Sequence, residues 1–98
     1  MQKLPRGWEL IEEWEGSFVF ENAKLKFTVN IDYSELLKVP YIIEFLHTEG
    51  FIKLVNFDDG IFKVTAINES EATEKAVLMM TFINKNIIWL LSTQSKQD

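Results

Sequence analysis

Residues 23–35, AKLKFTVNIDYSE, decide the predicted fold. Leu25, Phe27, Val29 and Ile31 alternate with polar side chains, which is the period-two pattern of a strand with one buried face. Residues 32–35 then place an acid at a helix N-cap and a glutamate three positions later, as in a capping box. The stretch therefore predicts a strand over residues 23–31 and the start of a helix at residue 32.

The apolar residues after position 32 continue at helical spacing to about residue 48. One face of the predicted helix carries Tyr33, Leu36, Leu37 and Pro40, and Val39, Ile42, Ile43 and Leu46 continue it. Gly50 is a natural stop. Pro40 conflicts with this helix, because it removes a backbone donor and predicts a kink or the first turn of a second helix.

Two β-rich runs, 51–57 and 61–68, flank Asp58-Asp59-Gly60, which predicts a hairpin. Asn68, with Glu71 three positions later, predicts the N-terminus of the next helix. Its apolar stripe consists of Ala72, Ala76, Met79, Met80 and Ile83. We expect residues 84–86 to end that helix, residues 87–91 to form a buried strand and residues 93–98 to be a frayed tail.

Read from residue 23, the order is strand, helix, strand, strand, helix, strand. This order predicts an α+β domain of the ferredoxin-like βαββαβ type, with two helices on one face of a four-stranded antiparallel sheet. Its length predicts a single domain over residues 1–98, with the core at 23–92. Residues 1–22 extend it as a hairpin or a helix, and we favour a hairpin, with strands near 8–13 and 17–20.

Composition excludes several classes of function. The 98 residues hold no cysteine and one histidine, so thiolate nucleophiles, iron–sulfur clusters and zinc–thiolate sites are excluded. A net charge of −5 with dispersed lysines argues against nucleic acid. The sequence shows neither a membrane span nor a signal peptide, so we expect a cytoplasmic protein. We predict no catalytic residue, metal ligand or cofactor, and an enzyme is the less favoured class.

The N-terminal segment carries the candidate binding site. Trp8 and Trp14 with Glu12, Glu13 and Glu15 are the combination expected of a surface that binds a basic partner. The alternative is that both indole rings pack on the sheet while the glutamates are solvated. His47, expected at a helix C-terminus, is explained by the helix-end carbonyls better than by catalysis.

A resemblance to the pterin carbinolamine dehydratase family begins at Gly7-Trp8-Glu9-Leu10 and continues through the predicted order of elements. The paired histidines of that chemistry are missing, since His47 is followed by Thr48. The resemblance therefore does not assign the chain to that family, and it would imply at most a degenerate enzyme.

Three functional hypotheses follow. The leading one is a non-enzymatic protein-interaction domain that self-associates as a homodimer through a strand edge or the open sheet face, and whose protein partner the sequence does not identify. The second is a small-ligand domain or degenerate enzyme with an aromatic-lined pocket and a carboxylate such as Asp32 or Glu44. The third is an acidic inhibitor of the immunity type that masks a basic surface.

Overall fold

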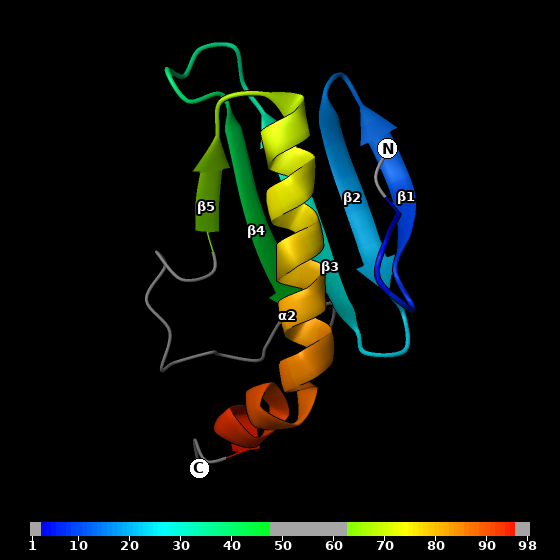
Figure 1. The fold of residues 1–98 in the computed structure, drawn as a ribbon. Helices are drawn as coiled ribbons and strands as arrows, with labels where there is room; N and C mark the ends of the chain where they lie inside the picture. The colour runs from blue at the N-terminus through cyan, green and yellow to red at the C-terminus, as the bar shows by residue number, and fades with distance from the viewer. Residues whose placement is uncertain (1–2, 48–62, 96–98) are drawn as a thin grey trace.

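A computed structural model describes the backbone of residues 3–47 and 63–95, and the side chains of these segments as far as residue 86. Five antiparallel strands form one sheet in the order of the chain. They are β1 (Glu9–Trp14), β2 (Ser17–Asn22), β3 (Phe27–Tyr33), β4 (Tyr41–His47) and β5 (Lys63–Ala66). One described helix, α2 (Glu69–Ser95), crosses one face of the sheet and contacts β3, β4 and β5 (Figure 1).

This architecture contradicts the predicted ferredoxin-like βαββαβ fold. Residues 32–47 do not form the predicted helix: β3 continues to Tyr33 and β4 occupies Tyr41–His47. Residues 87–91 do not form a strand, because α2 continues through them. The predicted strand 51–57 and the Asp58-Asp59-Gly60 hairpin lie outside the described residues, whereas β5 confirms a strand within residues 61–68.

The N-terminal hairpin is confirmed, and it extends one edge of the sheet. Glu15 and Gly16 both have positive φ, 46° and 88°, as the two central residues of a type I′ turn require. The register shifts between Leu10 and Glu12, so Ile11 is the extra residue of a β-bulge in the edge strand.

The strand predicted from the alternating pattern is confirmed for residues 27–31. Phe27, Val29 and Ile31 are fully buried beneath the helix, and they pair with residues that face the same side. The inner face is completed by apolar residues of the neighbouring strands, Phe18, Phe20, Ile43 and Phe45. The core therefore lies between this face and α2.

The start and the apolar stripe of α2 are also confirmed. The Asn68 side-chain oxygen accepts a hydrogen bond from the Glu71 backbone nitrogen at 2.8 Å, which caps the helix. All five residues of the predicted stripe are buried: Ala72, Ala76, Met79, Met80 and Ile83. Asn86 interrupts the helical dihedrals with φ −118° and ψ 17°, so α2 kinks there instead of ending.

Candidate functional site

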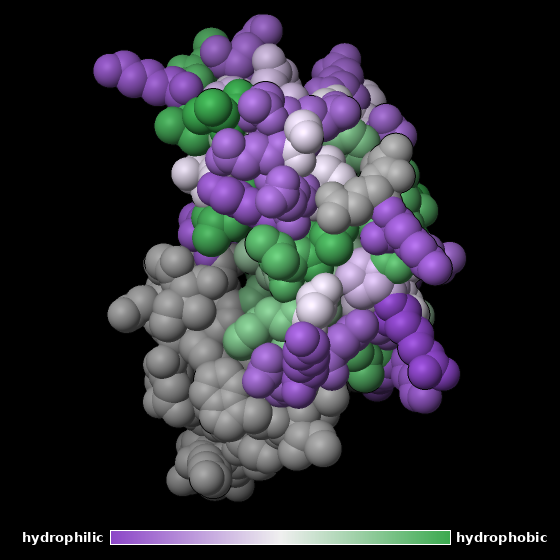
Figure 2. Space-filling model, viewed as in Figure 1, coloured by the Kyte–Doolittle hydropathy of each residue, from purple (hydrophilic) through white to green (hydrophobic). Residues whose placement is uncertain are grey.

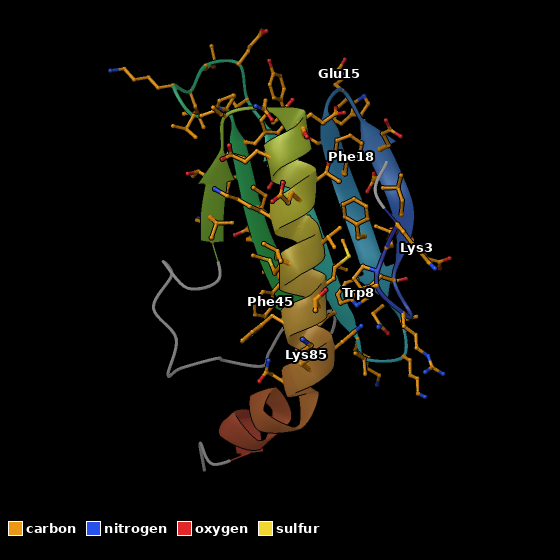
Figure 3. All side chains as sticks on the ribbon, viewed as in Figure 1. Lys3, Trp8, Glu15, Phe18, Phe45 and Lys85 are labelled. Atoms are coloured by element: carbon orange, nitrogen blue, oxygen red, sulfur yellow. The ribbon has the colours of Figure 1, made fainter. Side chains whose placement is uncertain are left out.

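The two tryptophans of the predicted site have opposite environments. Trp8 is 6% exposed and belongs to the core, where its indole Nε1 donates to Asn84 Oδ1 at 2.9 Å. Asn84 Nδ2 in turn donates to the Arg6 carbonyl oxygen at 3.1 Å. Trp14 is 72% exposed. The packing alternative therefore holds for Trp8, which lies beside the helix in Figure 3. Trp14 remains a candidate for binding.

The three glutamates are exposed, but they do not share one face. Glu12 pairs with Val19 and, like Trp14, lies on the face of the sheet away from the helix. Glu13 pairs with Phe18 and so lies on the helix side. Glu15 lies in the hairpin turn, at the upper end of the sheet in Figure 3. Strand alternation thus divides the predicted acidic surface.

The hairpin turn joins a row of residues across one end of the sheet. Ser17 Oγ accepts a hydrogen bond from the Tyr33 backbone nitrogen at 3.1 Å, which ties the turn to the end of β3. Tyr33 pairs with Tyr41, and their rings lie 4.9 Å apart. Tyr41 pairs with Ala66 at the end of β5. The β1–β2 turn, the β3–β4 loop and the start of α2 therefore meet at this end, which we call the loop end (Figure 1).

The loop end exposes a set of large apolar side chains. Leu36 is 90% exposed and Ile67 is 63% exposed. They are joined there by four other exposed apolar residues, Trp14, Tyr33, Leu37 and Val39. Figure 2 shows hydrophobic side chains at this end among hydrophilic ones. Single exposed apolar residues are common, whereas several gathered at one end of a small domain indicate a binding surface.

A short loop fixes this apolar surface. The Ser34 backbone nitrogen donates to the Pro40 carbonyl oxygen at 2.8 Å, and the Leu37 nitrogen donates to the Ser34 carbonyl oxygen at 3.3 Å. These bonds close the loop and leave the leucine side chains outside it. The sequence prediction missed this surface because it assigned Leu36 and Leu37 to the buried face of a helix. Pro40 was the signal against that helix.

Acidic residues surround the apolar surface. Glu15 and Glu35 line a shallow hollow of about 460 Å³ together with Tyr33, Ser34 and Leu36. Glu69 lies at the first turn of α2. Partial burial, the negative charge of Glu69 and the neighbouring Tyr33 raise the pKa of Tyr41, in that order of importance. The loop end is thus apolar, with three carboxylates and one exposed ammonium, Lys38, around it.

The other candidate groups have separate surroundings, and Asp32 lines a hollow of about 240 Å³ on the open face with Glu12, Trp14, Ser17 and Val19. His47 ends β4, so its expected place at a helix C-terminus is wrong; its ring lies edge-on to Phe27, 5.0 Å between centroids. Asp32 and Glu44 lie on the open face, where Glu44 is 4.0 Å from Lys63. Among the described residues, no three acidic or histidine side chains are grouped to hold a metal ion. The described helix lacks a long enough apolar stretch to cross a membrane.

Comparison with known proteins gives no relative: no protein-family model, curated protein or solved structure matches this chain.

Proposed function

We propose that this protein is a non-enzymatic interaction domain that binds another protein through the loop end. The observation that carries the proposal is the exposure of apolar side chains at the loop end: Leu36 lines the hollow that also holds Glu15 and Glu35, and Trp14 is exposed at the end of β1 on the open face. Burying such side chains supplies binding energy, and tryptophan is frequent among the residues that dominate it. The carboxylates favour a partner that surrounds its own apolar contact with lysine or arginine.

Charge favours a different protein over a second copy of this chain. Two loop ends brought together would bring three carboxylates of each copy close to three of the other, and each copy has only one ammonium there, Lys38, to offset them. The β1 edge is also poorly suited to pairing with another strand, since it carries a bulge at Ile11 and exposed glutamates. These features do not support self-association through the β1 edge, and self-association through another edge or through the open sheet face stays a prediction. We keep the cytoplasm as the proposed compartment.

A pair of leucine variants tests the proposal. Leu36→Ser changes the loop end, whereas Leu46→Ser makes the same change on the open face, where Leu46 is 50% exposed. Immobilised wild-type protein and both variants are compared for the proteins they retain from a cell extract, identified by mass spectrometry. We expect a partner retained by wild type and Leu46→Ser and lost by Leu36→Ser.

The same partner, once purified, is then titrated at increasing salt. Its affinity should fall as salt screens the loop-end carboxylates. Equal retention by the two serine variants would contradict the proposal. Light scattering of the isolated domain is the companion measurement, and a stable dimer that Leu36→Ser dissociates would replace the foreign partner by a second copy.

A further inference from the structure

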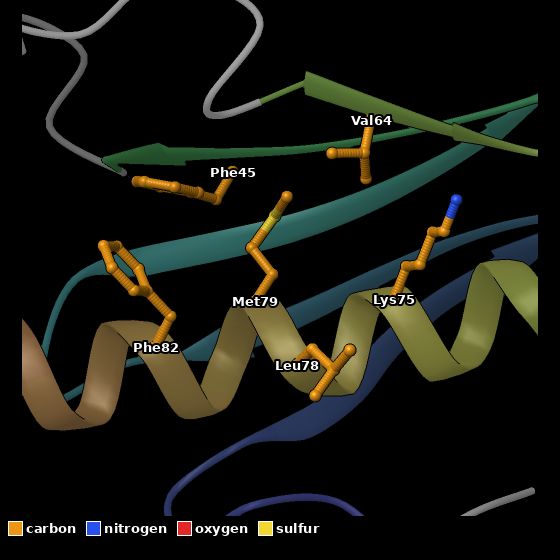
Figure 4. A pocket seen from close by; sticks show the side chains of 6 residues that line it. All are labelled: Phe45, Val64, Lys75, Leu78, Met79 and Phe82. Atoms are coloured by element: carbon orange, nitrogen blue, oxygen red, sulfur yellow. The ribbon is translucent and has the colours of Figure 1, made fainter.

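A second surface lies on the face of the sheet that α2 covers, between the helix and strands β4 and β5. Six residues line a groove of about 390 Å³ between the helix and strands β4 and β5: Phe45, Val64, Lys75, Leu78, Met79 and Phe82 (Figure 4). This volume is in the range of small-molecule sites. None of these residues belongs to the loop end, so the groove is independent of the proposed protein-binding surface.

The walls of the groove are almost entirely apolar. Phe45 and Met79 are 4% and 8% exposed and form its base as part of the core. Leu78 is 63% exposed and stands at its rim. Figure 4 shows Phe45 and Phe82 together at one end of the groove and Lys75 at the other. The groove therefore has an aromatic end and a cationic end.

The ammonium group at the cationic end retains hydrogen-bonding capacity. Lys75 Nζ donates to the Thr65 carbonyl oxygen at 2.7 Å and lies 3.1 Å from the Glu71 carboxylate. An ammonium has three N–H donors, and these contacts use two. A ligand oxygen is therefore able to take the third donor, or to replace the half-exposed Glu71 carboxylate.

From this arrangement we propose that the groove binds a medium-chain carboxylate, with its carboxylate at Lys75 and its alkyl chain running over Met79 toward the two phenyl rings. The apolar walls select an alkyl chain, and the Lys75 ammonium selects an anionic head that takes its third donor or displaces the Glu71 carboxylate. This ligand differs from the pocket expected from the sequence, because the groove is lined by a lysine and neither Asp32 nor Glu44 contributes to it.

Titration calorimetry with hexanoate, octanoate and decanoate tests the apolar part. Affinity should rise about fourfold for each added methylene until the groove is filled. Leu78→Ser should weaken octanoate binding, and Leu36→Ser, at the loop end, should leave it unchanged. If none of the three carboxylates shows saturable binding, the proposal is overturned.

Octanoate and octanol together test the cationic end. Lys75→Met should weaken octanoate binding about tenfold and leave octanol unaffected, because only the charged head needs the ammonium. Glu71→Gln should strengthen octanoate binding by removing the competing carboxylate. Circular dichroism checks that both variants are folded. Octanoate binding that neither substitution alters would refute the assigned orientation. These outcomes are separate from partner capture, so either proposal can fail alone.

Discussion

Replacing Trp8 by phenylalanine should destabilise the domain, and the structure sets the size of the effect. The substitution removes the indole Nε1 that donates to Asn84, a hydrogen bond of 2.9 Å, which costs about 1 kcal/mol. The phenyl ring also leaves space in a core site where Trp8 is 6% exposed, and losing that much buried apolar volume costs about 1 kcal/mol more. We therefore expect a loss of about 2 kcal/mol in the free energy of unfolding.

Trp14→Phe is the matched control, since it makes the same chemical change at a side chain that is 72% exposed. Its effect should stay within about 0.5 kcal/mol. Urea unfolding followed by circular dichroism measures both variants without relying on tryptophan emission. With a slope of about 1–2 kcal/mol per molar urea for a domain this small, the Trp8→Phe midpoint should fall by about 1–2 M.

A double-mutant cycle isolates the hydrogen bond. Combining Trp8→Phe with Asn84→Ala should show a coupling energy of about 1 kcal/mol, because each substitution alone already breaks the contact. If Trp8→Phe and Trp14→Phe unfolded at the same urea concentration, the assignment of Trp8 to the core and Trp14 to the surface would be refuted.

Five further substitutions, at four positions, test the helix cap, a glycine with positive φ and a tyrosine with a raised pKa. Asn68→Ala removes the cap of α2 and should cost about 1 kcal/mol by urea unfolding, and a Ser at the same position should restore most of it. Gly7→Ala should cost about 1–2 kcal/mol, because Gly7 has φ +87° and a Cβ there would lie 2.7 Å from Asn22 Nδ2; unchanged stability would contradict this backbone. Tyr41 has a raised pKa, so the folded state holds its proton more tightly than the unfolded chain. Its contribution to stability is complete below the ordinary value of 10.0 and is lost as pH rises through the raised pKa. Tyr41→Phe should therefore lose less stability than wild type between neutral and strongly alkaline pH, and Glu69→Gln should show an intermediate loss.

Local patterns predicted those elements whose residues interact with near neighbours. The alternation of Phe27, Val29 and Ile31 identified a strand because each residue meets the same buried face. Asn68 identified the start of α2 because its side chain caps a nitrogen three residues away.

The helix predicted between residues 32 and 48 was wrong because the apolar residues there fit both a helical period and a strand period. Leu36, Leu37 and Ile43 match a helical face, whereas Tyr41, Ile43 and Phe45 match a strand. The pairing of β4 with the whole length of β3 makes residues 41–47 a strand. Pro40 has no N–H to donate, so the loop lies before β4 and ends at this residue. Such pairing is tertiary information that a single sequence does not contain.

The end of α2 was missed for a similar reason. Residues 84–86, Asn-Lys-Asn, are typical of a helix end, yet both amides are used by the folded structure. Asn86 Nδ2 donates to the Phe82 carbonyl oxygen at 2.8 Å, at the kink, and Asn84 binds Trp8, which is 76 residues away in sequence. Of the five residues predicted for the site, Trp14 and Glu15 lie at the loop end, Trp8 lies in the core, and Glu12 and Glu13 lie on opposite faces of β1.

The sequential order of the five strands has a consequence for how this chain folds. Each strand pairs with a strand that precedes or follows it in the chain, so the sheet is able to grow one neighbour at a time from turns such as Glu15-Gly16. The contact between Trp8 and Asn84 instead joins the two ends of the chain, and loop-closure entropy delays such contacts. Trp8→Phe should therefore speed unfolding and leave the folding rate almost unchanged, because a contact that forms after the folding transition state affects mainly the unfolding rate. The contact between the two ends of the chain thus lengthens the lifetime of the folded domain.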